Sequence, residues 1–245
     1  MDTLKYRISS YWTRRAPSFA EQRARELSSG KRGRWLAELD RWLPGGRGLD
    51  VLDIGTGTGF FALLLSERGH RVTGIDLSEE MIRYAKQSAE RIGADAVFHV
   101  MDAEKPDLAP AGFDAIVTRN LTWALPHLED AYAAWGKLLR PNGVLVNFDA
   151  DYCRRTADAV DAETELPENH AHKQVSQELI DENEQITLEL SAHQLPRPQW
   201  DVGLLLDAGF ERVTVDTGVW ARVYAEKDEF YNPAPIFTIA AYRPK

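Results

Sequence analysis

The strongest constraint on the fold is an alternation of short apolar strands with helices between residues 51 and 148. The pattern predicts strands and helices at the following places: strands at 51–54, 71–75, 97–101, 113–118 and 144–148, and helices from residue 60, over 79–92 and over 128–139. Strands joined through helices form right-handed crossovers and a parallel sheet that is buried on both faces. We therefore expect a doubly wound α/β domain whose ligand site lies at the carboxyl ends of the strands.

The segments on either side of this alternation predict one domain of 245 residues with additions, not two domains. Residues 1–45 are expected to be helical, with helices at Ser18–Leu27 and Arg34–Leu43. Residues 46–150 form the core, and residues 151–200 form an inserted cap with a helix near His172–Ala192. Residues 201–245 return to the sheet through a helix at 200–208 and strands at 212–215 and 236–242.

The charge of the chain argues against a polyanionic partner. There are 29 Lys and Arg against 38 Asp and Glu, for a formal net charge of −9, which disfavours DNA and leaves RNA or protein as a weaker substrate class. The charge is uneven, because residues 1–50 hold 11 basic and 6 acidic residues whereas residues 151–200 hold 4 and 11. We expect these two segments to meet where the site closes. A single cysteine, Cys153, and the lack of a long apolar run predict a cytoplasmic protein with no membrane span.

A glycine-rich turn follows the first strand and reads Gly55-Thr56-Gly57-Thr58-Gly59. Glycines between a strand and a helix let the backbone turn tightly and approach a ligand closely. Asp53, just before the turn, either receives a cationic ligand or ties down the loop. A dinucleotide-binding turn has the spacing GxGxxG, but Phe60 stands where its third glycine would fall. An NAD-dependent oxidoreductase is therefore the less favoured alternative.

Two carboxylates at the ends of later strands indicate a nucleoside-like ligand. Asp76, about 20 residues past the turn, is placed to accept hydrogen bonds from both hydroxyls of a ribose. Asp102 ends the third strand and is placed to accept a hydrogen bond from an exocyclic adenine amine.

Together these motifs resemble the class I S-adenosylmethionine-dependent methyltransferases of the small-molecule, ubiquinone and menaquinone type. The resemblance covers about residues 10–150 and implies a Rossmann-like, mostly parallel seven-stranded sheet with a C-terminal antiparallel hairpin and an N-terminal helical lid over residues 1–45. It also implies that S-adenosylmethionine is the cofactor. The residues that it places at the cofactor are Tyr11, Asp53, Gly55, Thr56, Gly57, Gly59, Asp76, Leu77, Met81, Asp102, Ala103, Arg119 and Asn120.

The acceptor side is less defined by the sequence, which leaves O, N, S and C acceptors and the oligomeric state open. Methyl transfer from an activated sulfonium needs positioning first, and a general base only for some acceptors. The candidate catalytic residues are His127, Asp149 and His170, with His172 and His193 as further histidines. Trp123 and Tyr152 are candidate contacts of a small-molecule substrate, the cap is expected to set specificity, and no metal site is expected. A non-catalytic protein that binds a nucleoside cofactor is the remaining alternative.

Overall fold

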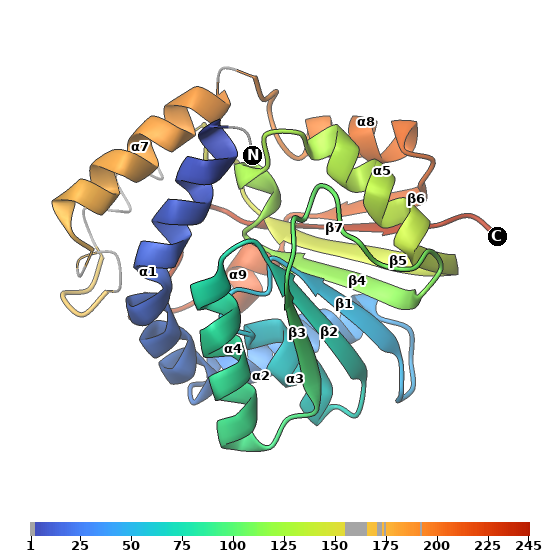
Figure 1. Ribbon diagram of the computed structural model, residues 1–245, viewed down its shortest axis with the longest axis horizontal. Coiled ribbons are helices and arrows are strands. Elements are labelled where there is room, and N and C mark those ends of the chain that lie inside the picture. Colours follow the sequence, from blue (N-terminus) through green and yellow to red (C-terminus); the bar gives the residue numbers. More distant parts are fainter. Residues whose placement is uncertain (1–2, 155–165, 171–172, 174, 192) are drawn as a thin grey trace.

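The structure, a computed structural model, describes residues 3–154, 166–170, 173, 175–191 and 193–245. Its strands are β1 (Asp50–Ile54), β2 (Arg71–Asp76), β3 (Ala96–Val100), β4 (Phe113–Arg119), β5 (Leu139–Asp149), β6 (Glu211–Asp216) and β7 (Phe237–Tyr242). They form one sheet in the order β3-β2-β1-β4-β5-β7-β6 (Figure 1). β1 to β5 pair in parallel, and β7 is antiparallel to both of its neighbours. The predicted doubly wound sheet with a C-terminal antiparallel hairpin is confirmed.

Helices cover both faces of this sheet. They are α1 (Thr3–Leu27), α2 (Lys31–Trp42), α3 (Phe60–Glu67), α4 (Glu79–Ile92), the 3-10 helix η1 (Thr122–Ala124), α5 (Leu128–Leu138), α7 (Gln177–Ser191), α8 (Gln199–Asp207) and α9 (Val219–Val223). Among the described residues, no helix is both long and apolar enough to cross a lipid bilayer.

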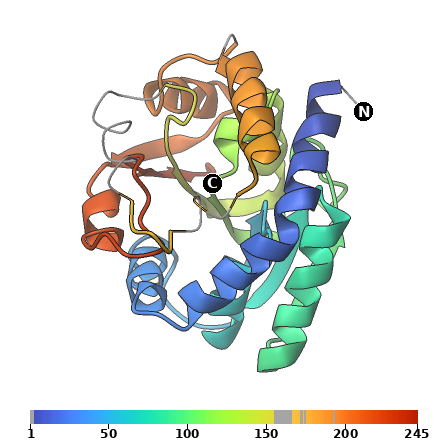
Figure 2. The same cartoon turned by 90° about the vertical axis from the view of Figure 1, so that its left-hand side faces the viewer.

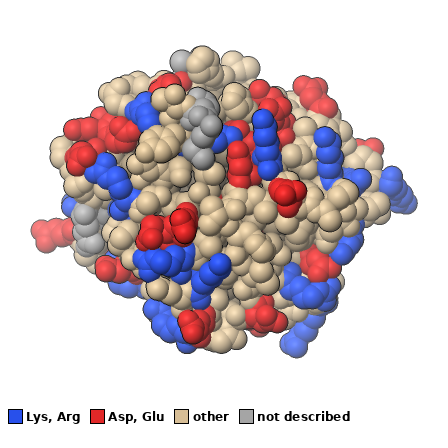
Figure 3. All heavy atoms as spheres, in the orientation of Figure 1, with Lys and Arg blue, Asp and Glu red and all other residues tan. Residues whose placement is uncertain are grey.

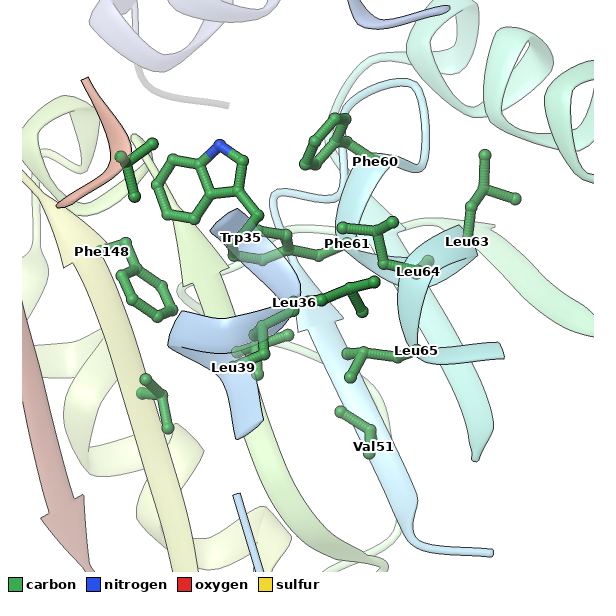
Figure 4. Close-up of a cluster of buried hydrophobic side chains, with 14 of the residues drawn as sticks. Trp35, Leu36, Leu39, Val51, Phe60, Phe61, Leu63, Leu64, Leu65 and Phe148 are labelled. Atoms are coloured by element: carbon green, nitrogen blue, oxygen red, sulfur yellow. The ribbon is translucent and has the colours of Figure 1, made fainter. Parts of the chain in front are cut away.

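Alternate residues along each central strand enter two separate cores. In β5, Val144, Val146 and Phe148 join the core beneath α2, α3, α4 and α9, whereas Leu145 faces α5 and α8 on the other side. Side chains of a strand alternate between its faces, so a strand buried on both faces must be apolar at nearly every position. Figure 4 shows the first core, where Trp35 of α2 lies among Phe61, Phe148 and the leucines of α3.

Several elements differ from the sequence prediction. The first helix begins at Thr3, not Ser18, because Pro17 is accommodated inside it while α1 packs on α4 and α7. β5 begins at Leu139, five residues earlier than expected, and α9 was not predicted because five residues are too few to show a periodicity. The predicted helix at 172–192 is α7 over Gln177–Ser191; residues 172 and 192 lie outside the described residues.

α1 crosses the carboxyl ends of the central strands. In Figure 2 it runs diagonally over the molecule, with α4 on one side and α7 on the other. The helix therefore covers the edge of the sheet at which a doubly wound fold binds its ligand.

A buried charge cluster fastens the segment before α8 to the end of β5. The side chain of Arg197 is fully buried; its Nη2 and Nε atoms donate to Asp201 at 2.6 and 2.8 Å, and its Nη1 atom lies 3.3 Å from Asp149 Oδ2. Asp149 also accepts hydrogen bonds from the Thr122 hydroxyl and from the Trp123 amide. The cluster thus joins the end of β5, η1 and α8.

We expect Arg197→Met to lower the free energy of unfolding by roughly 3–5 kcal/mol, because it leaves two buried carboxylates without their cation. Urea unfolding at pH 7 measures the change. Arg83→Met, which removes an exposed pair with Glu80, is the matched control and is expected to change stability far less. Equal effects of the two substitutions on stability would contradict the role given to Arg197.

Candidate functional site

A cavity of about 1120 Å³, measured with its open mouth, lies between α1 and the carboxyl ends of β1, β2 and β4. Most of the predicted cofactor residues lie on its wall. Those that line it are Asp53, Gly55, Thr56, Gly57, Asp76, Leu77, Met81, Asp102, Ala103, Arg119 and Asn120.

Two predicted cofactor residues do not line the cavity. Gly59 ends the turn at the start of α3, and a Cβ there would meet Ala85 and Phe98 at 3.4 Å, so it serves helix packing. Tyr11 lies on the far side of α1, in an apolar cluster with Ile186 and Leu190 of α7. The role predicted for Tyr11 stays a prediction, and its neighbour Trp12 lines the cavity.

The glycine turn is shaped by close contacts at two of its positions. Gly55 has φ of +67°, and a Cβ built on it would lie 2.8 Å from the side chain of Leu121. Gly57 has φ of +54°, and its Cβ would lie 3.2 Å from the ring of Phe19. Any larger residue would be strained and crowded at either position, so the backbone itself forms this part of the wall.

Asp53 ties down the glycine turn. Its Oδ2 atom accepts hydrogen bonds from the Thr56 hydroxyl at 2.7 Å and from the Ala62 amide at 3.0 Å, and the residue is 2% exposed. Burial raises the pKa of Asp53 to about 7. Two roles were considered for Asp53, receiving a cationic ligand or tying down the loop, and these contacts fit the second.

Asp76 links the turn to the start of α4. Its two oxygens accept one backbone hydrogen bond each, from Gly57 at 3.0 Å and from Ser78 at 2.9 Å. Each oxygen therefore keeps a lone pair for a further donor. Burial raises the pKa of Asp76 to about 6. Ser78 caps α4 by accepting from the Met81 amide, and its hydroxyl lies 2.9 Å from that of Thr13 in α1.

Asp102 is paired with a lysine that the sequence analysis did not select. Lys5 Nζ of α1 lies 2.8 Å from Asp102 Oδ2 and also contacts the buried carboxylate of Glu104. The other Asp102 oxygen accepts from the Glu104 amide. α1 is thereby fixed to the segment that follows β3.

One stripe of α1 forms the roof of the cavity. The lining residues that it contributes are Lys5, Ile8, Ser9, Trp12, Phe19 and Arg23. Steps of three, four and seven residues place all of them on one face of a helix. That spacing is visible in the sequence and could have identified them, had the helix been predicted from residue 3 onward.

The cap supports this roof from outside. Arg7 pairs with Glu182 and Glu189 at 2.8 Å, and Arg14 pairs with Glu178 at 2.9 Å. On the α1–α7 side of Figure 3, basic and acidic side chains lie close together. The basic first segment and the acidic cap do meet, as expected. However, it is α1 that covers the site, since no described residue between 151 and 200 lines the cavity.

A buried ion cluster joins the C-terminal end of α1 to the end of β4. Glu26 Oε1 accepts from Arg119 Nη2 at 2.8 Å and from Trp35 Nε1 at 3.0 Å, and Glu26 also contacts Arg23. The Arg119 guanidinium lies 4.2 Å from the Trp35 ring and 4.8 Å from that of Phe60. Two guanidinium groups share one carboxylate here, so this end of the cavity carries excess positive charge.

Trp123 and Tyr152, the predicted substrate contacts, lie behind the cavity wall. Their rings pack edge to face with centroids 5.4 Å apart. Both hold Asn120, which lines the cavity: Trp123 Nε1 donates to the Asn120 carbonyl at 3.1 Å, and the Tyr152 hydroxyl donates to Asn120 Oδ1 at 3.1 Å.

The three candidate catalytic residues are also away from the cavity wall. His127 is exposed at the start of α5, Asp149 belongs to the Arg197 cluster, and His170 is buried with Nε2 2.7 Å from the Tyr231 carbonyl. His193 is exposed, and His172 lies outside the described residues. Residue type alone does not fix the direction of a side chain, and these residues stay predictions. Across the described ranges, no group of three or more His, Cys, Asp or Glu side chains could hold a metal ion.

Glu26 generates a pH-dependent prediction. Burial would raise the pKa of Glu26, but Arg119 and Arg23 outweigh it and lower the pKa to about 2. A lowered pKa stabilises the fold above the unfolded value near 4.5, and this stabilisation is lost as the pH falls from there toward 2. Glu26→Gln should therefore lower the free energy of unfolding by roughly 3–5 kcal/mol at pH 7.

The loss of unfolding free energy caused by Glu26→Gln should shrink as the pH falls below 4.5. Urea unfolding of wild type and variant at pH 7, 5 and 4 measures it. Glu80→Gln removes an exposed carboxylate that pairs with Arg83 and serves as the control. A deficit that is small at pH 7, or that grows as the pH falls, would contradict the prediction.

Known proteins share this architecture. Residues 51–143 match a family model described as a methyltransferase domain. A phosphatidylethanolamine N-methyltransferase of Cereibacter sphaeroides is 35% identical over 102 residues, which are 41% of this chain and 50% of that protein. A ubiquinone biosynthesis O-methyltransferase of Idiomarina loihiensis is 32% identical over 97 residues, which are 39% and 40% of the two chains. The chain thus spans half or less of these curated relatives.

Solved structures agree on the fold. Phosphoethanolamine N-methyltransferase 2 of Haemonchus contortus, in complex with S-adenosyl-L-methionine, superposes with a TM-score of 0.60 and 18% identity over 86% of this chain and 52% of that one. A SAM-dependent methyltransferase from Aquifex aeolicus gives a TM-score of 0.55 and 20% identity over 89% and 92%. Residues 51–143 thus match a methyltransferase domain in sequence, and the chain shares its fold with methyltransferases of known structure.

Proposed function

We propose that this chain transfers a methyl group from S-adenosylmethionine to a small-molecule acceptor. The observation that carries the proposal is the arrangement of Gly55, Gly57 and Asp76 on one wall of a cavity that α1 covers. The family match and the relatives support methyl transfer over the alternative of an NAD-dependent oxidoreductase. The relatives named above include both N- and O-methyltransferases, so they leave the acceptor atom open.

The residues present fit this cofactor. The turn at Gly55 and Gly57 leaves room for no side chain, so its backbone can lie against the methionine portion. Asp76 has free lone pairs for the two ribose hydroxyls, with Leu77 and Met81 as the apolar walls for adenine. At Asp102, Lys5 already occupies one oxygen, so an adenine amine would share this carboxylate with α1.

The opposite end of the cavity fits the amino-acid portion of the cofactor. Arg119 and Arg23 carry one more positive charge than Glu26 neutralises, and Arg119 Nε is buried without a hydrogen-bond partner among the described residues. A carboxylate is the natural partner of such a guanidinium pair. We assign this end to the α-carboxylate.

The cofactor, when bound, would supply a methyl group already activated on a sulfonium. The chain then has to position the acceptor and exclude water, for which the α1 roof is suited. None of the candidate bases His127, Asp149 and His170 lines the cavity, so the proposal includes no proton transfer to them. The covered cavity supports a small acceptor over a nucleic acid. The single cysteine supports a cytoplasmic location.

Binding of S-adenosylhomocysteine tests the proposal. Calorimetry should show binding to the wild type and roughly 10- to 100-fold weaker binding to Asp76→Ala, which loses hydrogen bonds to a charged acceptor. Asp95→Ala, at an exposed position, is the control and should bind as the wild type does. No binding at high micromolar ligand, or a change in NADH fluorescence instead, would overturn the proposal. Binding without multiple-turnover methylation of any compound would favour a non-catalytic protein.

The affinity should also depend on pH between 5 and 7. The pKa of Asp76 is about 6 in the unliganded protein, and the ionised carboxylate accepts both ribose hydroxyls. Below pH 6 the proton must leave before binding, so the dissociation constant should rise by up to about tenfold per pH unit. Asp76→Asn should bind more weakly with a flatter profile, measured by the same titration. A flat wild-type profile would contradict the role given to Asp76.

A further inference from the structure

The cavity is electrostatically divided across the sheet. Asp76 ends β2 and Asp102 follows β3 at one side, and Arg119 ends β4 and Asn120 follows it at the other. Arg23 of α1 lines the same end as Arg119, whose guanidinium contacts the same Glu26. The β4 end therefore offers hydrogen-bond donors. What Asn120 adds there depends on the orientation of its side-chain amide.

The backbone of Asn120 is held at both of its polar atoms. Its amide donates to the Phe148 carbonyl at 2.8 Å, and its carbonyl accepts from Trp123 Nε1 at 3.1 Å. The residue has φ of +55°, a conformation that Asn adopts more readily than most side chains. Asn120 is therefore fixed in place, and only its side-chain amide has two possible orientations.

A chain of hydrogen bonds selects one of these orientations. It begins at the backbone amide of Ala234, which can only donate and does so to Asn232 Oδ1 at 3.0 Å. Asn232 must then turn Nδ2 toward Tyr152, whose hydroxyl oxygen accepts at 2.7 Å. The Tyr152 proton is left to donate, and it does so to Asn120 Oδ1 at 3.1 Å.

A hydrogen-bond donor is thereby left at the cavity wall, because Asn120 lines the cavity. Its Oδ1 atom is occupied by Tyr152, and its Nδ2 atom donates to none of the described residues. An N–H donor needs a hydrogen-bond acceptor on the ligand, and an amine or ammonium group offers its own hydrogens instead.

We propose that Asn120 donates a hydrogen bond to the oxygen atom that receives the methyl group, and that the acceptors are oxygen acids such as carboxylates or ionised phenols and enols. The inference rests on the proposed function. In the step, an oxygen lone pair forms the bond to the methyl carbon, the carbon–sulfur bond breaks, and its electron pair goes to sulfur. The products are a methyl ester or ether and S-adenosylhomocysteine. No proton is lost, which agrees with a cavity wall that none of the candidate bases reaches.

The aromatic side chains around this cavity suit planar probes. Trp12, Phe19 and Phe60 all line it. We therefore choose two matched pairs of single-ring compounds, benzoate with benzylamine and 4-nitrophenolate with 4-nitroaniline. Calorimetry on protein saturated with S-adenosylhomocysteine measures their binding, and release of S-adenosylhomocysteine from S-adenosylmethionine measures turnover. In each pair the oxygen acid should bind at least about tenfold tighter than the amine, as for a hydrogen bond with a charged partner.

Tyr152→Phe tests the orienting chain. It removes one hydroxyl while the ring keeps its packing on Trp123, so the Asn120 amide is free to reverse. The ratio of the affinity for the oxygen acid to the affinity for the matched amine should fall toward one, while the affinity for S-adenosylhomocysteine stays unchanged. Asn120→Asp, which places a second acceptor against an oxyanion, should abolish the binding of oxygen acids. Tyr6→Phe, 65% exposed on α1, is the matched control and should behave as wild type.

The acid-to-amine ratio separates positioning from mere loss of stability, because a loosened fold weakens both classes alike. Equal binding of acids and amines by the wild type would overturn the inference. So would a wild-type ratio in Tyr152→Phe, or binding of neither class to the saturated protein. Failure to bind S-adenosylhomocysteine would instead overturn the proposed function, and the inference with it.

Discussion

The ion pair between Glu26 and Arg119 joins the roof of the cavity to its floor. Glu26 stands near the end of α1 and is fully buried, and Arg119 ends β4 with its side chain 9% exposed. Separating them would leave charges of both signs in an apolar interior, which costs far more than the loss of an exposed pair. The position of α1 over the strands therefore depends on this contact, and so does every cavity residue that α1 contributes.

The other contacts of α1 act differently. Its pairs with α7 are exposed in part, and such pairs contribute little stability individually. The seam between the two helices is apolar, with Tyr11 and Ile8 against Ile186 and Leu190. Apolar burial and the Glu26 cluster therefore hold the helix in place, and the ion pairs lie beside the apolar seam.

The central sheet and the cofactor side of the site followed from the sequence because both depend on local patterns. Strands buried on both faces must be apolar, and a turn that bears a ligand must be free of side chains at Gly55 and Gly57. A helical lid over residues 1–45 was predicted, but its lining residues from Lys5 to Arg23 were not identified because its helix was expected only from Ser18. The surroundings of the candidate catalytic residues could not be predicted, because the partners of Asp149 and His170 lie 48 and 61 residues away along the chain.

Asn120 shows why the acceptor side requires the structure. The sequence marks the residue, but the two ends of its amide are equivalent in any sequence pattern and opposite in chemistry. The choice between them is made by Tyr152 and Asn232, through bonds spanning 32 and 80 residues of the chain. It begins at a backbone N–H, the one group in the chain of bonds that cannot reverse. Trp123 and Tyr152 both act on Asn120, one by holding its backbone carbonyl and the other by holding its side-chain amide.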